Sequence, residues 1–324
     1  MKGTAPAPEG TGLFPFNGVI DLEQIPVKPI RRKTTLNDVW RGRSGYLFIL
    51  PHFALFAVFF LVPVGWGMYL SMFKYNVFSQ TFVWFDNYKR ILSDWLFLKS
   101  LKNTFFYTFG VVPLWLGKAL LVTVLIYPFR KGIRTFFKAA FYLPHVTSTV
   151  IISMIWLWVF NPNFGLLNYF MTVLGLEPVV WLGRSLTAMP SLIIMQVIMG
   201  GGSTIVLLSA AMASIPEYYF EAATLEGAGS WTVFRKITVP LLKPTILYAL
   251  VMGTIANFQT FSNIYIMTSG GPEFSTTTIA YLIYETAFKN YNLGLASAMS
   301  MVMFAILVVL GIIQFKWLGS NVEY

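Results

Sequence analysis

The sequence predicts an all-α polytopic membrane protein with about six transmembrane helices, and its composition and the lengths of its apolar runs predict this class. Of 324 residues, 56% are hydrophobic and 11% are charged, whereas roughly a quarter of a soluble domain is charged. The mean hydropathy is +0.66. The apolar residues come in runs as long as the roughly 17–25 residues that a helix needs to cross a bilayer. The chain has no cysteine, which excludes disulfides, thiol catalysis and Cys-ligated metals.

Six segments are expected to span the lipid bilayer, at about 46–73, 103–127, 136–160, 186–213, 244–268 and 295–318. The stretch before Tyr46 is rich in proline, glycine and charge, so residues 1–45 are expected to form a cytoplasmic tail with a short interfacial helix at Leu36–Trp40. A signal peptide has its apolar core in roughly the first 15–30 residues, and none is expected here. Residues 46–318 then form the membrane domain, and residues 319–324 form a second short cytoplasmic tail.

The basic residues predict the orientation of the spans. With the N-terminus in the cytoplasm, 15 lysines and arginines fall on the cytoplasmic side and 7 on the opposite side. Positive residues are enriched in cytoplasmic loops, so this asymmetry predicts that both termini are cytoplasmic. The loop between the first two spans runs against the trend with five positive charges, although Asp86 and Asp94 offset part of them.

A polar loop, residues 214–243, connects the fourth and fifth expected spans. Pro216 followed by alanine, glutamate and leucine predicts a short helix at about 217–226. Gly227 and Gly229 are expected to end that helix, because glycine adopts the left-handed conformation of a helix C-terminus at little cost.

The second half of this loop is expected to contain another short helix, from Gly229 to Phe234. Pro240 and Pro244 are then expected to bring the chain back to the membrane. The loop as a whole predicts a helix–turn–helix exposed on the cytoplasmic face.

The spacing within the loop resembles the EAA loop of ABC importer permeases. The matching residues are Glu221-Ala222-Ala223, Gly227 and Ile237-x-x-Pro240, and Val239 stands where that family usually has leucine. The alternative is an amphipathic loop helix with a proline-bounded return.

Further motifs resemble the sugar-permease branch of that family, in particular the larger subunit of maltose-type permeases in a compact six-span form. They cover residues 46–318 and are Asn103-Thr104, Tyr142-Leu143-Pro144, Trp156 to Pro162, Phe164 to Asn168, Thr268 to Pro272 and Gly294 to Ala298.

The resemblance implies a type I ABC importer permease fold in a bacterial cytoplasmic (inner) membrane. It implies a second permease subunit, expected to be a different chain, two ATP-binding cassette subunits and an extracytoplasmic solute-binding protein. ATP and Mg would be bound by the partner ATPase, and this chain would bind no cofactor. The residues implied to contact the ATPase are Glu221, Ala222, Ala223, Glu226, Gly227, Ile237 and Pro240.

Polar side chains within the third, fourth and fifth expected spans indicate a translocation path, because polar groups in hydrocarbon usually face a cavity. Hydroxyls and amides beside aromatic rings suit a neutral sugar or oligosaccharide. The alternative is helix packing, since small residues are common where membrane helices touch. By resemblance to the maltose permease, the sugar contacts would be Thr149, Gln196, Gly200, Ser203, Asn257 and Thr260.

Two features within the expected spans leave their roles open. Gly200-Gly201-Gly202 suits a gate or broken helix at the level of the substrate, or a tight helix crossing. Lys118 is the only cation deep within an expected span. It would snorkel, pair with another chain, or face the path and attract an acidic oligosaccharide.

Other functional classes fit the sequence less well. An ion-coupled secondary transporter is the first alternative, but no Asp or Glu lies within an expected span and no internal repeat is visible. A membrane enzyme lacks support because His52 and His145 have no carboxylate at metal-ligand spacing and no phosphate-binding loop occurs. Thus no catalytic and no metal-binding residue is expected. Nucleic acid is not expected as a partner, since the basic residues lie beside apolar runs.

Overall fold

The computed structural model describes residues 43–76 and 79–319. The greater part of the expected N-terminal tail, its interfacial helix and most of the expected C-terminal tail lie outside these residues. The chain divides into two units, Met1–Phe59 and Phe60–Tyr324.

The first candidate span, Phe48–Ser71, is formed by α2 (Arg43–Phe56), the π-helical turn η2 (Ala57–Leu61) and α3 (Val62–Ser71). Proline follows shortly after this turn, and a proline without an N–H leaves the carbonyl four residues earlier without its usual helical donor. A π-helical turn is one way for a helix to absorb such a disturbance.

Among the described residues, four helices are long and apolar enough to cross a membrane, and the number of spans rises to six if each of two bent helix pairs is one span. This agrees with the expected six, although the boundaries differ. The second span, α5, covers Trp95–Ile126 and begins eight residues before the expected start at 103. Its first turn is fixed by the Asp94 side chain, which accepts a hydrogen bond from the backbone N–H of Leu96 at 2.8 Å. The last span, α16 (Leu293–Leu318), begins two residues earlier than expected.

The loop between the first two spans is ordered by a hairpin. Strands β1 (Phe73–Asn76) and β2 (Ser79–Phe82) pair antiparallel, with Phe73 opposite Phe82. Helix α4 (Asp86–Ser93) follows. The Asn87 side chain donates to the carbonyls of Ser71 and Phe73 at 2.8 and 2.9 Å, which ties this loop to the end of α3.

The third and fourth spans are not straight helices; the break in the third was not expected, whereas a broken helix at Gly200-Gly201-Gly202 was one of the two expected alternatives for the fourth. Helices α6 (Lys131–Val146) and α7 (Thr149–Val159) meet at 96°, and α9 (Ser185–Met199) and α10 (Gly202–Ala213) meet at 43°. The first break has a local cause: Thr147 is extended, and Ser148 starts α7 by accepting a hydrogen bond from the backbone N–H of Val150. The short helix α8 (Leu166–Val173) lies between these pairs in the chain.

The fifth span corrects the expected extent of the loop 214–243. After α11 (Tyr218–Leu225), the chain becomes helical again at Ser230 and forms one candidate span that ends at Met267. This span consists of α12 (Ser230–Val233), η3 (Phe234–Thr238), α13 (Val239–Phe258) and α14 (Ser262–Met267). Pro240 therefore lies in the first turn of α13 and Pro244 inside it, rather than in a returning loop. Because η3 continues directly into α13, the missing N–H of Pro240 deprives a carbonyl of η3 of its usual donor, and a π-helical turn is one way to absorb that disturbance.

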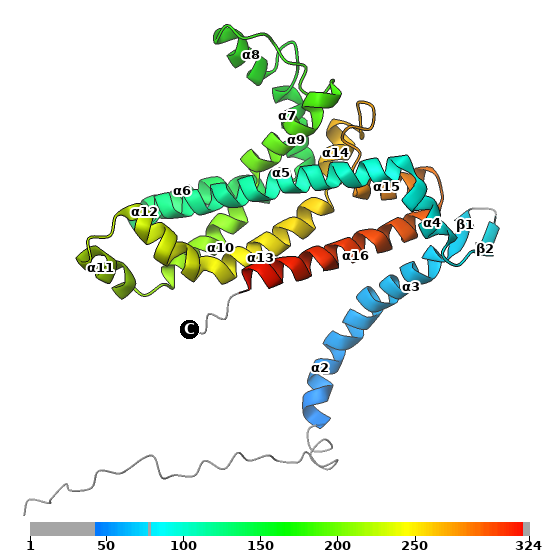
Figure 1. Cartoon of the computed structure of the whole chain (residues 1–324), viewed down its shortest axis with the longest axis horizontal. Coiled ribbons are helices and arrows are strands. Elements are labelled where there is room, and N and C mark those ends of the chain that lie inside the picture. Colours follow the sequence, from blue (N-terminus) through cyan, green and yellow to red (C-terminus); the bar gives the residue numbers. More distant parts are fainter. Residues whose placement is uncertain (1–42, 77–78, 320–324) are drawn as a thin grey trace, which may run out of the picture. The chain divides into compact units, whose positions relative to one another are not determined.

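Helix α13 lies between α5 and α16 within residues Phe60–Tyr324 (Figure 1). The polypeptide between α14 and α16 contains α15 (Ile279–Tyr284) and the π-helical turn η4 (Glu285–Lys289). It is fastened to α5, since Asn103 donates to the carbonyls of Phe274 and Thr277 and the backbone N–H of Ile279 donates to Thr104 Oγ1. The Asn103-Thr104 motif is thereby brought into contact with the segment that directly follows the motif Thr268 to Pro272.

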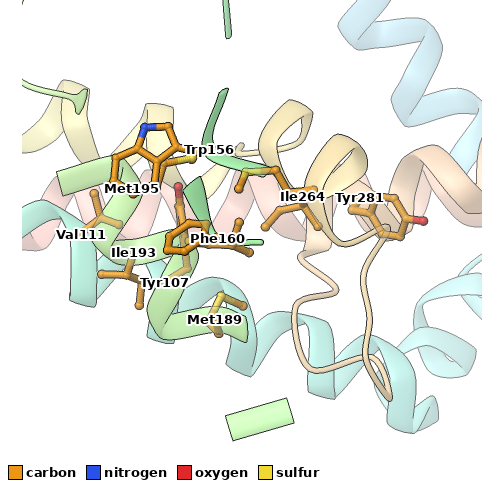
Figure 2. Packing of buried hydrophobic residues seen from close by; sticks show 11 residues of the cluster. Tyr107, Val111, Trp156, Phe160, Met189, Ile193, Met195, Ile264 and Tyr281 are labelled. Carbon is orange, nitrogen blue, oxygen red and sulfur yellow. The ribbon is translucent and has the colours of Figure 1, made fainter. Parts of the chain in front are cut away.

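The buried core around Tyr107 and Val111 of α5 is rich in aromatic residues and methionine. Figure 2 shows its side chains, which come from α5, α7, α9, α14 and α15. Trp156 and Phe160 lie one helical turn apart with ring centroids at 5.0 Å. This packing fixes α7 and α9, which carry Thr149, Ser153 and Gln196 among the polar residues described next.

Candidate functional site

A cavity of about 480 Å³ lies among α5, α6, α9, α10 and α13. Four of the six expected path residues line it: Gln196, Gly200, Ser203 and Asn257. Its wall is completed by residues that the sequence did not single out for this role, notably Trp115, His145, Tyr248 and Met252. No lysine, arginine, aspartate or glutamate is among the described residues of this wall.

A second cavity, of about 110 Å³, adjoins the first and shares His145, Gln196 and Gly200 with it. Thr149 lines this smaller cavity. Thr260 lines neither cavity, and its carbonyl accepts a hydrogen bond from the Thr278 side chain at 3.0 Å.

A chain of hydrogen bonds holds the polar wall between the two cavities. Asn263 donates to Gln196 Oε1 at 3.0 Å, and its own Oδ1 lies 3.1 Å from the Ser153 hydroxyl, which donates. Asn263 and Ser153 are buried. The network therefore holds the amide oxygen of Gln196 and leaves the amide nitrogen of Gln196 available to a ligand.

Asn257 is oriented by its own helix. Its Nδ2 donates to the carbonyl of Gly253, one turn earlier, at 2.8 Å. The amide oxygen is left as the group that can accept a hydrogen bond from a ligand hydroxyl.

The three consecutive glycines combine both roles that the sequence left open. Gly201 has φ +96°, a left-handed conformation that breaks the helix, and a Cβ there would lie 2.8 Å from Trp115 Nε1. A Cβ on Gly202 would collide with the carbonyl of Phe141 in α6. One glycine thus makes the bend and its neighbour permits the close helix crossing.

Lys118 contacts backbone carbonyls and does not line the path, which was one of the three roles expected for it. From α5, its ammonium group donates to the carbonyls of Val197, Ile198 and Gly200 at 2.5, 2.9 and 2.6 Å. These carbonyls belong to the C-terminal end of α9, where backbone acceptors have no helical donor. Lys118 is a cap for the broken helix, and it lines neither cavity.

The expected coupling helix is present as α11, Tyr218–Leu225, against an expected range of 217–226. It ends as the glycine spacing predicted. Gly227 has φ +68°, its N–H donates to the carbonyl of Thr224, and the N–H of Ala228 donates to the carbonyl of Ala223. This is a Schellman motif, which needs a left-handed residue at the position of Gly227.

The exposed surface of α11 is acidic. Glu221 and Glu226 are exposed, and Glu221 lines a groove of about 280 Å³ with Tyr127, Phe220 and other residues. The hydrogen bond that the Tyr218 hydroxyl donates to Tyr219 raises the pKa of Tyr218, so this hydroxyl stays neutral and the carboxylates carry the charge of this surface.

The other expected coupling residues differ in their surroundings. Ala222 is exposed, whereas Ala223 is buried against the chain itself. Ile237 is half-buried in η3, and Pro240 is exposed on the first turn of α13.

Comparison with known proteins identifies the family. Residues 119–323 match the family described as binding-protein-dependent transport system inner membrane component. A probable ABC transporter permease of Bacillus subtilis (strain 168) is 34% identical over 287 residues, which are 87% of this chain and 92% of that protein. The trehalose/maltose transport system permease of Thermococcus litoralis is 34% identical over 280 residues, 85% and 93% of the two chains.

A solved structure shares the fold. A chain in the crystal structure of a bacterial alginate ABC transporter, in complex with an alginate pentasaccharide-bound periplasmic protein, superimposes with a TM-score of 0.76 at 22% identity, over 86% of this chain and 95% of that chain. The fold is therefore that of a type I ABC importer permease. In this family ATP is hydrolysed on a separate subunit, so the chain is a transport subunit and no enzyme. The chain belongs to the family of inner membrane components of binding-protein-dependent transport systems.

Proposed function

We propose that this chain forms part of the path for a neutral sugar or oligosaccharide, with Gln196, Ser203 and Asn257 as its hydrogen-bonding groups. The supporting observation is the lining of the larger cavity, which combines neutral amides and a hydroxyl with the Trp115 ring. A sugar ring has hydroxyls around its rim and C–H groups on its faces. A concave site of about 480 Å³ with a few polar groups on an apolar wall suits that chemistry.

The charges around the cavity favour a neutral substrate over an anionic one. The suggestion of an acidic oligosaccharide rested on the net charge of +10 and on Lys118, and the Lys118 ammonium is occupied by three backbone carbonyls. Recognition of a phosphate or carboxylate usually employs arginine or lysine. The described cavity walls contain neither residue.

The transport cycle would be driven through α11. Glu221 and Glu226 would meet basic residues on an ATP-binding cassette subunit, while Gly227 holds the end of the helix in position. Two such subunits, which bind ATP and Mg, and a second permease complete the proposed assembly. Both termini would be cytoplasmic, and residues 163–185 and 270–290 would face the solute-binding protein on which the family's transport depends.

Uptake in cells that lack this chain tests the proposal. Cells complemented with the wild-type chain are supplied with tritiated maltose, trehalose or diacetylchitobiose, and with labelled sn-glycerol 3-phosphate for comparison. Uptake of a sugar but not of the phosphate ester is expected. Uptake of only the phosphate ester would contradict the assignment of a neutral sugar.

A further inference from the structure

Four aromatic side chains form a continuous surface beyond the larger cavity, and we name them the aromatic platform: Phe261, Tyr265, Tyr284 and Phe288. Neighbouring ring centroids lie 4.8–5.6 Å apart. The rings come from the start of α14, the end of α15 and the turn η4, so three short elements are needed to assemble it.

The platform is open on one side and rests on Tyr281 on the other. Tyr265 and Phe288 are 41% and 64% exposed, whereas Tyr281 is 2% exposed.

Polar groups border the rings. Lys289 and Glu285 form an ion pair at 2.8 Å, and the Lys289 ammonium lies 6.0 Å from the centre of the Tyr265 ring. Burial raises the pKa of the Tyr281 hydroxyl, and its hydrogen bond to the Glu285 carboxylate raises that pKa further. The hydroxyl therefore remains protonated and donates to Glu285 at 2.8 Å. Lys289 and Tyr281 both bind Oε1 of Glu285. No described residue donates to its Oε2, which can accept from a ligand hydroxyl.

The polypeptide connects the platform directly to the cavities. Asn257 lines the larger cavity near the end of α13, and Phe261 follows it by four residues. On α14, Tyr265 faces outward while Asn263, two residues earlier, is buried and lines the smaller cavity. One short helix thus presents rings on one face and an amide to the cavity on the other.

We propose that the aromatic platform is a second carbohydrate subsite, where a pyranose ring stacks on Tyr265 and Phe288 and its hydroxyls meet Glu285 and Lys289. The C–H face of a pyranose is apolar and its rim is polar, and the platform has the same division between rings and charged border. Aromatic surfaces supply large contact area with little loss of side-chain freedom. The assignment rests on the proposed function, because it takes the transported solute to be a sugar.

Two other occupants of this surface are less well supported. Tyrosines are also enriched where membrane proteins meet lipid headgroups, and a second permease could cover exposed rings. An ion pair among the rings favours a ligand with hydrogen-bonding groups over lipid chains or an apolar subunit contact, because charges are depleted from the centres of protein interfaces.

Photo-crosslinking in the intact transporter identifies the occupant. A photoreactive phenylalanine, p-benzoylphenylalanine, replaces Tyr265 or Phe288, and the complex is irradiated during uptake of the tritiated disaccharide, among maltose, trehalose and diacetylchitobiose, that the wild type transports. Phe304, a 58% exposed phenylalanine on α16, is the matched control position. Radiolabel on this chain is expected from positions 265 and 288 and not from 304. Crosslinks to lipid or to a second permease alone would overturn the assignment.

Uptake rates at limiting sugar provide a second measurement. Tyr265→Ala and Phe288→Ala are expected to lower the rate about three- to ten-fold, the range that loss of one aromatic contact predicts. Tyr265→Phe keeps the ring and should retain the rate, as should Phe304→Ala. Normal uptake by both alanine variants would contradict the subsite and leave the proposed function intact. A wild type that takes up none of the three sugars would contradict both.

Discussion

The ammonium nitrogen of Lys118 lies 2.6 Å from the carbonyl oxygen of Gly200, the residue that directly follows the last residue of α9. Gly200 also lines both cavities. Lys118, which lies within α5, therefore supports the cavity wall from the side away from the cavity. It does so by binding a helix C-terminus, where the backbone carries partial negative charge.

Removal of the Lys118 charge should destabilise the break between α9 and α10. Lys118→Met leaves three backbone carbonyls without their donor, and an unsatisfied buried group costs about 1–3 kcal/mol. We expect a melting temperature lower by roughly 2–8 °C and reduced uptake, measured on the purified complex. Lys131→Met, at an exposed lysine of α6, is the control. A Lys118→Met complex with unchanged melting and uptake would refute this role.

Truncation of the cavity amides should weaken sugar binding without harming assembly. In Gln196→Ala with Asn257→Ala, two hydrogen-bonding groups are lost, which predicts a KM for uptake about ten-fold higher. Gln80→Ala, at an exposed amide in β2, should have no effect. Wild-type kinetics in the double variant would show that the substrate does not contact this wall.

Reversal of the charge on α11 should separate ATP hydrolysis from transport. Glu221→Lys places a cation on an exposed acidic surface, where like charges on an ATPase would repel it. We expect ATP hydrolysis stimulated by the loaded binding protein to fall to about a tenth or less. Asp86→Lys, at an exposed aspartate of α4 outside the surfaces assigned to the binding protein, should hydrolyse ATP normally. Equal stimulation in both variants would remove Glu221 from the coupling contact.

The left-handed backbone conformation of Gly227 should itself be required for the stability of the end of α11. At φ +68° an alanine is strained, although a Cβ there would meet open space. Gly227→Ala should therefore cost about 1 kcal/mol through conformation alone, and Gly227→Asn should cost less, because asparagine tolerates left-handed φ. Thermal unfolding and stimulated ATP hydrolysis of the two variants are compared. A milder effect of alanine than of asparagine would argue against the Schellman end of α11.

The ion pair beside the platform predicts a specific pH dependence. The hydrogen bond that Lys289 donates to Glu285 raises the pKa of Lys289 above its ordinary value of 10.5. A raised lysine pKa stabilises the folded state fully below the unfolded pKa, and this stabilisation is lost as pH rises through the folded pKa. The difference in melting temperature between wild type and Lys289→Gln should be constant from about pH 6 to 9 and shrink only above about pH 10.5. A difference that disappears near neutral pH would contradict the pairing.

The elements that the sequence predicted best were those with local causes. The range of α11 was predicted to within one residue at each end, because Gly227 alone specifies where that helix ends. Span α16 was predicted to within two residues at its start, since its apolar run is uninterrupted. Four of the six path residues, which the resemblance to the maltose permease implied, line one cavity.

The features that sequence reasoning missed depend on contacts between distant residues. Hydropathy is the same for a straight helix and a bent one, so the 96° bend before Thr149 left no signal in the apolar pattern. The partners of Lys118 are about 80 residues away and are backbone atoms, which no side-chain pattern records. The wall residue Trp115 could have been suspected, because it lies one turn from Lys118 on the same face of α5.

A single cysteine at Ser203 tests the central claim most directly. The natural chain has no cysteine, and Ser203→Cys changes one atom in the cavity wall. In a complex whose other subunits lack reactive thiols, a bulky methanethiosulfonate reagent should abolish sugar uptake by Ser203→Cys, and the transported sugar should slow that reaction. Ser300→Cys, on α16 outside both cavities, should continue to transport. If Ser203→Cys reacted fully and still took up sugar at the original rate, the cavity would not be the path.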